Sequence, residues 1–267
     1  MAPIALASCG ATVGNTSEPL AQVEVIPGTI RTELYAELLE TYVDDEGLVD
    51  YEGLQANREP LDAYIADLAA LDDATYNSWT DEEQIAYWMN AYNAITLMSI
   101  VDQDPIRPSI KDIRGVWRVR RHEIYGGAKT LNGIEHDVLR VDYDEPRLHA
   151  AIVCAAISCP LLRTEPFVGE RLDEQLDEQV LGWLAKEDGL LIDREENVVY
   201  LSKIFDWFTG DWEPSFGVET GFTGNDEQRA VLNFISQYVD ESDREYLEAG
   251  EYDVKYFNYD WSLNVQS

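Results

Sequence analysis

The chain has 267 residues, 45% of them apolar, and a formal charge of −33 from 52 acids and 19 bases. This apolar content excludes a wholly disordered chain, and the length suits one large domain or two small ones. The charge repels nucleic acid and anionic lipid, so neither is expected as a partner. Because no run of 18 or more residues is apolar, no transmembrane helix is predicted.

The N-terminus resembles a bacterial lipobox over Leu6–Ala7–Ser8–Cys9–Gly10. We therefore expect residues 1–9 to be a truncated lipoprotein signal with Cys9 as the lipidation site, and residues 10–28 to be a polar linker. The apolar stretch that precedes a lipobox is missing, so either the true start lies further upstream or the match is chance. On the first interpretation the protein is exported, periplasmic or in the cell envelope, and it meets the membrane only through the lipid at Cys9.

Helical spacing of apolar residues begins at Thr29 and ends at Gly47, and a second amphipathic helix is predicted from Pro60 to Leu71. Thr80 and Glu83 have the spacing of a capping box, which opens a helix from Glu82 to about Val101.

That helix is apolar nearly all round, so it is predicted to be central and buried. Its two asparagines, Asn90 and Asn93, then need hydrogen-bond partners in the core. They either bond backbone of neighbouring elements or orient a catalytic group.

Further elements follow from periodicity and turn signals. They are a helix from Thr130 to Arg140, a β-type run over Leu148–Val153, a helix over Leu172–Leu184, a hairpin over Leu190–Leu201, a helix over Asp226–Val239 and an aromatic strand over Tyr252–Trp261. This order predicts an α+β class. We expect a single domain over residues 29–264, mostly helical around the central helix, with a small antiparallel sheet.

The residues best suited to nucleophilic chemistry gather between His149 and Pro160. In a regular strand, His149 and Cys154 point to opposite faces. Cys159 precedes Pro160, which is favoured at the first position of a helix, so its thiol is predicted to lie at a helix N-terminus with a lowered pKa. Cys159 is therefore the predicted nucleophile, and His149 its base.

Other interpretations of these residues stay open. Cys154 and Cys159 could form a disulfide in an exported protein, and with His136 and His149 they could bind zinc. The spacing is not Cys-x-x-Cys, so we assign no metal and no cofactor. The histidines could also be purely structural.

One basic segment interrupts the acidic sequence. It holds Arg107, Lys111, Arg114, Arg118, Arg120, Arg121 and Lys129. The segment is either a counter-surface for the acidic remainder or a cationic rim that receives an anionic substrate or the C-terminus of a peptide.

Several motifs together resemble the domain-of-unknown-function 547 family of bacteria, plants and nematodes. They are Ala86–Tyr87–Trp88–Met89–Asn90–Ala91–Tyr92–Asn93–Ala94, Leu131–Asn132–Gly133–Ile134–Glu135–His136, Arg147–Leu148–His149–Ala150 through Ser158–Cys159–Pro160, Leu201–Ser202–Lys203–Ile204–Phe205 and Tyr259–Asp260–Trp261–Ser262–Leu263–Asn264. The family pattern is distantly similar to papain-like and transglutaminase-like folds. Transglutaminase-like enzymes place their cysteine at the start of the central helix, where this chain has Asn90 and Asn93.

We therefore expect an uncharacterised envelope-associated thiol hydrolase or acyltransferase that acts on an amide or peptide-like substrate. Asn93 or Glu135 would orient His149. Asn90, His136, Arg118 and Arg120 would bind the peptide-like or small-molecule ligand. The alternative is a non-catalytic module that binds a peptide or glycan and contains a structural Cys154–Cys159 pair.

Overall fold

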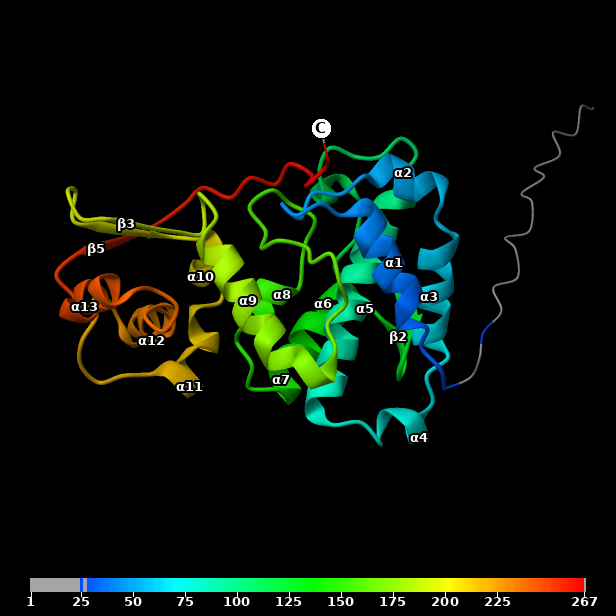
Figure 1. Ribbon diagram of the computed structural model, residues 1–267, viewed down its shortest axis with the longest axis horizontal. Helices are drawn as coiled ribbons and strands as arrows, with labels where there is room; N and C mark the ends of the chain where they lie inside the picture. Colours follow the sequence, from blue (N-terminus) through cyan, green and yellow to red (C-terminus); the bar gives the residue numbers. More distant parts are fainter. Residues whose placement is uncertain (1–24, 26–27, 267) are drawn as a thin grey trace, which may run out of the picture.

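Two lobes make up the part of the chain that the computed structural model describes, which is Val25 and residues 28–266. The lipobox, Cys9 and the predicted linker up to Pro27 lie outside it. The helical lobe carries α1 to α8, the sheet lobe carries β3 to β5 with α10 to α13, and α9 lies between them (Figure 1). Each lobe has its own cluster of buried apolar side chains, and Tyr259 packs against both clusters.

The helical lobe is built around α5, which covers Asp81–Val101 and is buried along nearly its whole length. Thr80 and Glu83 form the predicted capping box. The other elements of this lobe are α1 (Thr32–Tyr42), α2 (Tyr51–Ala56), α3 (Glu59–Ala69), α4 (Asp73–Tyr76), η1 (Ile110–Asp112), β1 (His122–Ile124), β2 (Gly127–Lys129), α6 (Leu131–Ile134), the π-helical η2 (Glu135–Leu139), α7 (Arg140–Asp142) and α8 (Leu148–Ala151). The periodicity thus predicted the central helix correctly.

The sheet lobe holds a three-stranded mixed sheet in the order β3–β4–β5. The predicted hairpin is confirmed as antiparallel β3 and β4, and β1 and β2 form a small antiparallel sheet in the helical lobe. The β5 strand pairs with β4 in parallel, which the sequence did not predict. The elements after the helical lobe are η3 (Gly169–Arg171), α9 (Leu172–Leu184), β3 (Leu190–Asp193), β4 (Val198–Leu201), α10 (Lys203–Trp207), η4 (Thr209–Asp211), α11 (Glu213–Phe216), α12 (Asp226–Ile235), α13 (Glu241–Ala249) and β5 (Asp253–Tyr256). The α+β class is confirmed.

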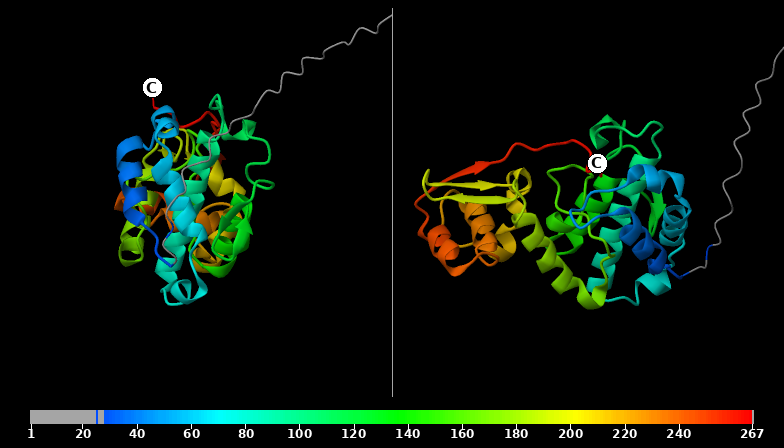
Figure 2. Two further views of the ribbon diagram at one scale, coloured as in Figure 1. Left: turned by 90° about the vertical axis from the view of Figure 1, so that its right-hand side faces the viewer. Right: turned by 45° about the horizontal axis from the view of Figure 1, so that its top comes forward.

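After β5 the chain returns across the molecule to the helical lobe, where the described part ends near α2 (Figures 1 and 2). Val49 pairs with Val265 in an isolated bridge. The buried Asn264 side chain accepts a hydrogen bond from Tyr51 and donates one to the Gly47 carbonyl. The predicted terminal strand is therefore only partly a strand, and its second half serves to bind the two lobes together.

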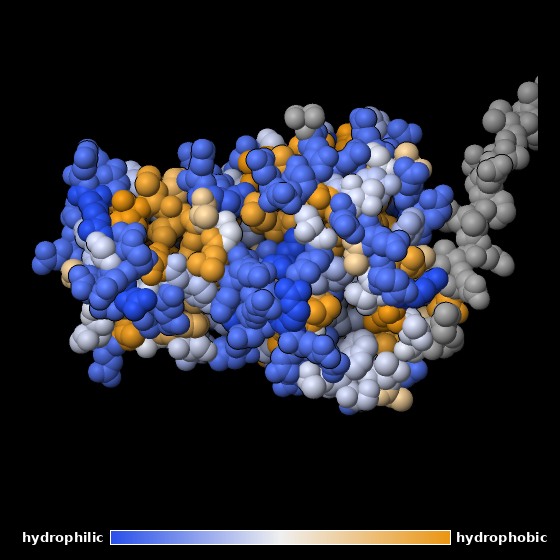
Figure 3. Space-filling model, in the orientation of Figure 1, coloured by the Kyte–Doolittle hydropathy of each residue, from blue (hydrophilic) through white to orange (hydrophobic). Residues whose placement is uncertain are grey.

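The surface of the face shown in Figure 3 is mainly hydrophilic, as the acidic composition requires, and apolar groups gather there mostly over the sheet lobe. Within the described residues, none of the helices has the length and apolar character needed to cross a membrane.

Candidate functional site

A cavity of about 600 Å³ lies where the two lobes meet. Its wall comes from the 111–119 loop, α5, the π-helical η2, α8, the 154–159 segment, α10 and the C-terminal return. Its chemistry-bearing lining residues are Tyr92, Lys111, Arg114, Arg118, Glu135, His136, His149, Cys154, Cys159, Trp207, Tyr259 and Trp261. Most of the candidates from the sequence therefore share one cavity.

Cys154 and Cys159 form a close pair of free thiols on this wall, with their Sγ atoms 2.7 Å apart. The backbone N–H of Cys154 donates to the Cys159 sulfur at 2.9 Å. The Tyr259 hydroxyl lies 3.1 Å from the Cys154 sulfur. Polar groups thus surround a thiol pair that is otherwise enclosed by apolar side chains.

This environment shifts the pKa values of the two thiols in opposite directions. Burial opposes ionisation of Cys159, but hydrogen bonds from the Cys154 thiol, the Tyr259 hydroxyl and the backbone at Cys154 and Ala156 outweigh it, and they lower the pKa of Cys159. The hydrogen bond with Cys159 and burial raise the pKa of Cys154. Cys159 is therefore the thiol that ionises first.

His149 is buried in α8 and pairs with an acid from the sheet lobe. Its Nε2 lies 2.7 Å from Oδ2 of Asp211. Burial opposes ionisation of Asp211, but hydrogen bonds from Arg140 and His149 hold the pKa of that carboxyl well below its usual range. An ionised carboxylate only accepts hydrogen bonds, so Nε2 carries the proton and donates it. Nδ1 makes no hydrogen bond to a described residue and is left as the basic nitrogen of a ring that lines the cavity.

Arg140 connects this pair to the second histidine. Its guanidinium binds both oxygens of Asp211, at 2.5 and 2.6 Å, and donates to Nδ1 of His136 at 2.8 Å. Burial and the positive charge of Arg140 lower the pKa of His136. Burial likewise lowers the pKa of His149 despite its bond to Asp211. Both imidazoles are therefore neutral near pH 7, but the unprotonated Nδ1 of His136 already accepts from Arg140, whereas Nδ1 of His149 is available to accept a proton.

Glu135 provides a further proton acceptor beside the thiols. It is 9% exposed, and the Tyr92 hydroxyl donates to its Oε2 at 3.4 Å. Burial raises the pKa of Glu135 to about 7, against the lowering effect of Arg140. The histidine closest to its carboxylate is His136, at 3.9 Å, whereas the sequence-based expectation was that Glu135 orients His149.

With this geometry in place, comparison with known families gives one match, to the family described as "Protein of unknown function, DUF547", over residues 76–184. We call residues 76–184 the DUF547 segment. No curated protein and no solved structure matches the chain. The family resemblance is therefore confirmed for this segment, and the papain-like or transglutaminase-like similarity stays a prediction.

The DUF547 segment supplies both thiols, His149 and Glu135, whereas Asp211 and Tyr259 lie beyond it. Asp211 was missed by sequence reasoning. It is one of 52 acids, and its neighbours form no local pattern that distinguishes it. Tyr259 lies in a motif that the resemblance had marked, so its aromatic hydroxyl was a usable signal.

Asn93 and Asn90 act on backbone rather than on the reactive groups. Asn93 donates to the Ala151 carbonyl and accepts from the Val153 N–H, at 2.9 and 2.8 Å. Asn90 makes the same pair of bonds with Phe167. The expectations that Asn93 orients His149 and that Asn90 binds substrate are corrected: both side chains bond the backbone of neighbouring segments, which was the other interpretation, and both lie outside the lining of the cavity.

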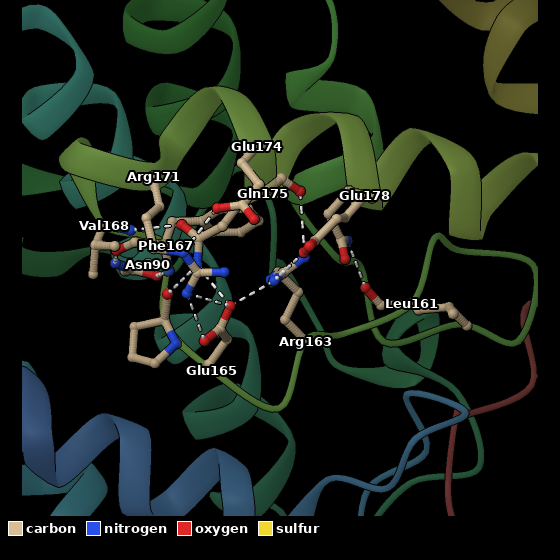
Figure 4. Close-up of polar contacts among 12 residues, drawn as sticks. Asn90, Leu161, Arg163, Glu165, Phe167, Val168, Arg171, Glu174, Gln175 and Glu178 are labelled. Carbon is tan, nitrogen blue, oxygen red and sulfur yellow. Dashed lines mark hydrogen bonds and ion pairs between the residues drawn. The ribbon is translucent and has the colours of Figure 1, made fainter. Parts of the chain in front are cut away.

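The backbone around the thiols differs from the prediction. Residues Leu148–Ala151 form the short helix α8 rather than a strand, and no helix begins at Pro160. His149 and Cys154 consequently line the same cavity instead of pointing apart. The segment after Cys159 is held by ion pairs of Arg163 with Glu165 and Glu178, and its Phe167 backbone is held by Asn90 (Figure 4). The lowered pKa of Cys159 thus comes from local donors and not from a helix N-terminus.

Of the two arginines proposed to bind substrate, Arg118 lines the cavity, whereas the Arg120 side chain turns back to donate to the Arg114 carbonyl and lies outside the lining. The Arg120 assignment is therefore corrected. Among the described residues, no group of three or more histidine, cysteine, aspartate or glutamate side chains is arranged to hold a metal ion.

Proposed function

We propose that the protein is a thiol-dependent hydrolase or acyltransferase for amide or peptide-like substrates. The observation that carries the proposal is that an ionisable thiol, Cys159, and a histidine held by a carboxylate, His149–Asp211, line one cavity large enough for a small ligand.

In this mechanism the Cys159 thiolate attacks the acyl carbon of the substrate. The carbonyl becomes an oxyanion, which the Tyr259 hydroxyl and the N–H of Cys154 stabilise, because the Cys159 sulfur no longer holds these donors once it is bonded to the acyl carbon. His149, which has taken the thiol proton of Cys159 at Nδ1, gives it to the leaving amine as the C–N bond breaks, which leaves an acyl thioester on Cys159. Asp211 stabilises the imidazolium. His149 then takes a proton from water, giving hydrolysis, or from an acceptor nucleophile, giving acyl transfer.

The test is acylation by p-nitrophenyl acetate, an activated ester that needs no specific recognition. We expect a stoichiometric burst of nitrophenolate and one acetyl group on the peptide that contains Cys159, detected by mass spectrometry. Cys159→Ala should abolish the burst, Cys154→Ala should retain it, and His149→Ala should slow the subsequent deacylation at least about 100-fold. Acetylation of Cys154 instead, or deacylation that is indifferent to His149, would refute these roles.

A non-catalytic ligand-binding module is the second candidate, and the aromatic wall of the cavity favours it. Trp207 and Trp261 lie in stacked orientation with centroids 5.8 Å apart, Tyr259 lies 4.6 Å from Trp261, and Trp207 is 44% exposed. Aromatic faces of this kind bind the apolar side of peptides and sugars. Binding of an oligosaccharide that is weakened by Trp207→Ala but not by Cys159→Ala, with no acylation of the thiol, would support this function instead.

We also propose export and lipid attachment at Cys9, on the basis of the Leu6–Gly10 segment alone. With an upstream leader present, the protein should partition into detergent, and Cys9→Ala should move it to the aqueous phase. Identical fractionation of the two forms would remove the support for a lipid anchor.

A further inference from the structure

Three cations line the cavity mouth without acidic partners. Lys111, Arg114 and Arg118 all contribute to the wall, and none of them forms an ion pair with a described residue. Most of the other arginines that the structure describes are paired with carboxylates, as expected for a chain with 52 acids. Lys111, Arg114 and Arg118 are therefore three unpaired cations that lie together on the wall of the cavity.

The loop that carries these cations is held firmly. Ile110, Ile113 and Val116 are 0%, 2% and 1% exposed, and they pack the loop against the core of the helical lobe. Ile113 and Val116 also line the cavity, as do Lys111, Arg114 and Trp117, each of which directly follows one of the buried apolar residues. The loop that is packed on the core therefore forms the cavity wall itself.

Two backbone features maintain this shape. Gly115 has a φ of +72°, and a Cβ at this position would lie 2.7 Å from Cβ of Val119, so a side chain is excluded there. The carbonyl of Trp117 accepts a hydrogen bond from the Asn132 N–H at the start of α6. Arg114 and Arg118 are therefore presented by a turn whose geometry the rest of the lobe determines.

Between the cations and the thiols the wall is aromatic. The Lys111 ammonium lies 4.8 Å from the Trp261 ring centroid, and Trp261 in turn contacts Tyr259, whose hydroxyl lies beside Cys154. A ligand that reaches from the thiols to the cations must therefore combine a reactive carbonyl, an apolar segment and an anionic group.

We propose that Lys111, Arg114 and Arg118 form a carboxylate-binding subsite, so that the substrates of this cavity are peptide-like amides with a carboxylate beyond an apolar segment. The reactive amide of this substrate class rests on the proposed function, and its carboxylate rests on the unpaired cations. Guanidinium groups bind carboxylates in bidentate geometry, and the acidic remainder of the protein repels the same group elsewhere on the surface.

The test compares alkylation of Cys159 by 6-(iodoacetamido)hexanoate and by N-hexyl iodoacetamide, two reagents of similar size of which only the first carries a carboxylate beyond its apolar segment. Arg114→Glu with Arg118→Glu should lower the ratio of the two rates about tenfold. Arg107→Glu with Arg121→Glu is the matched control, since both residues lie in the same basic segment, outside the lining, and the change in net charge is equal.

The control pair should leave the ratio nearly unchanged, and the effect of the first pair should shrink at high salt, because the Debye length falls to about 3 Å at 1 M. An equal fall in both double variants, or no fall in either, would overturn the subsite. Alkylation needs no enzymatic turnover, so this result is independent of whether p-nitrophenyl acetate acylates Cys159. Failure of the proposed function and failure of the subsite are therefore distinguishable.

Discussion

His149 and Asp211 lie 62 residues apart in the sequence and come from different lobes, yet their side chains meet at 2.7 Å on the wall of one cavity. Asp211 also accepts two hydrogen bonds from Arg140 of the helical lobe. A single carboxylate thus sets the tautomer of the histidine and joins the lobes beside the thiols. The site exists only when the lobes are packed together, so its chemistry and its stability are linked.

Asp211→Asn should destabilise the fold by about 1–3 kcal/mol at pH 7, because it leaves the Arg140 guanidinium without its counter-charge. The pKa of Asp211 is lowered in the folded state, so its contribution is present above its unfolded pKa of about 3.9 and is lost as the pH falls through the folded value. Urea unfolding should therefore show a smaller difference between the two forms at pH 3 than at pH 7.

Asp226→Asn is the control for that comparison, since Asp226 pairs with Arg229 but its side chain is 78% exposed. Its loss should cost less than about 0.5 kcal/mol at either pH. If the two variants lose equal stability, Asp211 is an ordinary surface partner and does not hold the lobes together.

Cys154→Ala and Tyr259→Phe should each raise the pKa of Cys159, because each removes a hydrogen-bond donor to its thiolate. A hydrogen bond to a charged group contributes about 1.5–3 kcal/mol, which corresponds to about one to two pKa units. The pH dependence of iodoacetamide alkylation at Cys159 measures this shift. Cys154→Ser keeps an O–H donor and should shift the pKa less than Cys154→Ala, and the opposite order would contradict the donor role of Cys154.

Elements with a local cause were predictable from the sequence. The α5 helix follows from the Thr80 capping box and its continuous apolar composition, and α9 from the spacing of its apolar residues. The β3–β4 hairpin follows from the turn residues between its strands, where Asn197 has a φ of +56°. In each case the signal lies within the element itself.

The backbone conformation of the site was not predictable in the same way, because it depends on tertiary packing rather than on a local sequence signal. The apolar run Leu148–Val153 is too short for its periodicity to distinguish a strand from a helix. In the fold its first four residues form the buried helix α8, which packs against α9. Pro160 permits a helix start but does not require one, and the preceding Ile157 and Ser158 pair with the C-terminal return instead. These two local ambiguities produced the wrong account of why Cys159 is acidic, although they did not change the choice of thiol.

Asn93→Asp should destabilise the fold by about 1–3 kcal/mol or more, because the Ala151 carbonyl loses its donor and a buried carboxylate replaces the amide. It should also slow alkylation of Cys159, since Asn93 holds the backbone between His149 and Cys154. Asn57→Asp is the control, because its amide bonds the Gly53 carbonyl at an exposed position. Thermal unfolding of the two variants beside the parent chain measures the difference. Equal melting temperatures would show that Asn93 does not support this segment.

Glu135→Gln should stabilise the protein at pH 8 and have much less effect at pH 5. Burial raises the pKa of Glu135 from 4.5 to about 7, so its protonated form stabilises the fold below pH 4.5, and this contribution is lost as the pH rises through about 7. Ionising it in the folded state therefore costs about 3 kcal/mol at pH 8, and about 1 kcal/mol or less at pH 5. Glutamine keeps the shape of the protonated acid and avoids the cost.

Chemical denaturation of the parent chain and Glu135→Gln at the two pH values gives the measurement. Glu123→Gln is the matched control, because Glu123 is exposed on β1 and the change in net charge is the same. The gain at pH 8 should appear in Glu135→Gln alone. A gain of equal size at both pH values would mean that glutamine merely packs better, and a loss at pH 8 would mean that the ionised carboxylate is stabilised in the cavity. Either result would remove Glu135 as a proton acceptor beside the thiols.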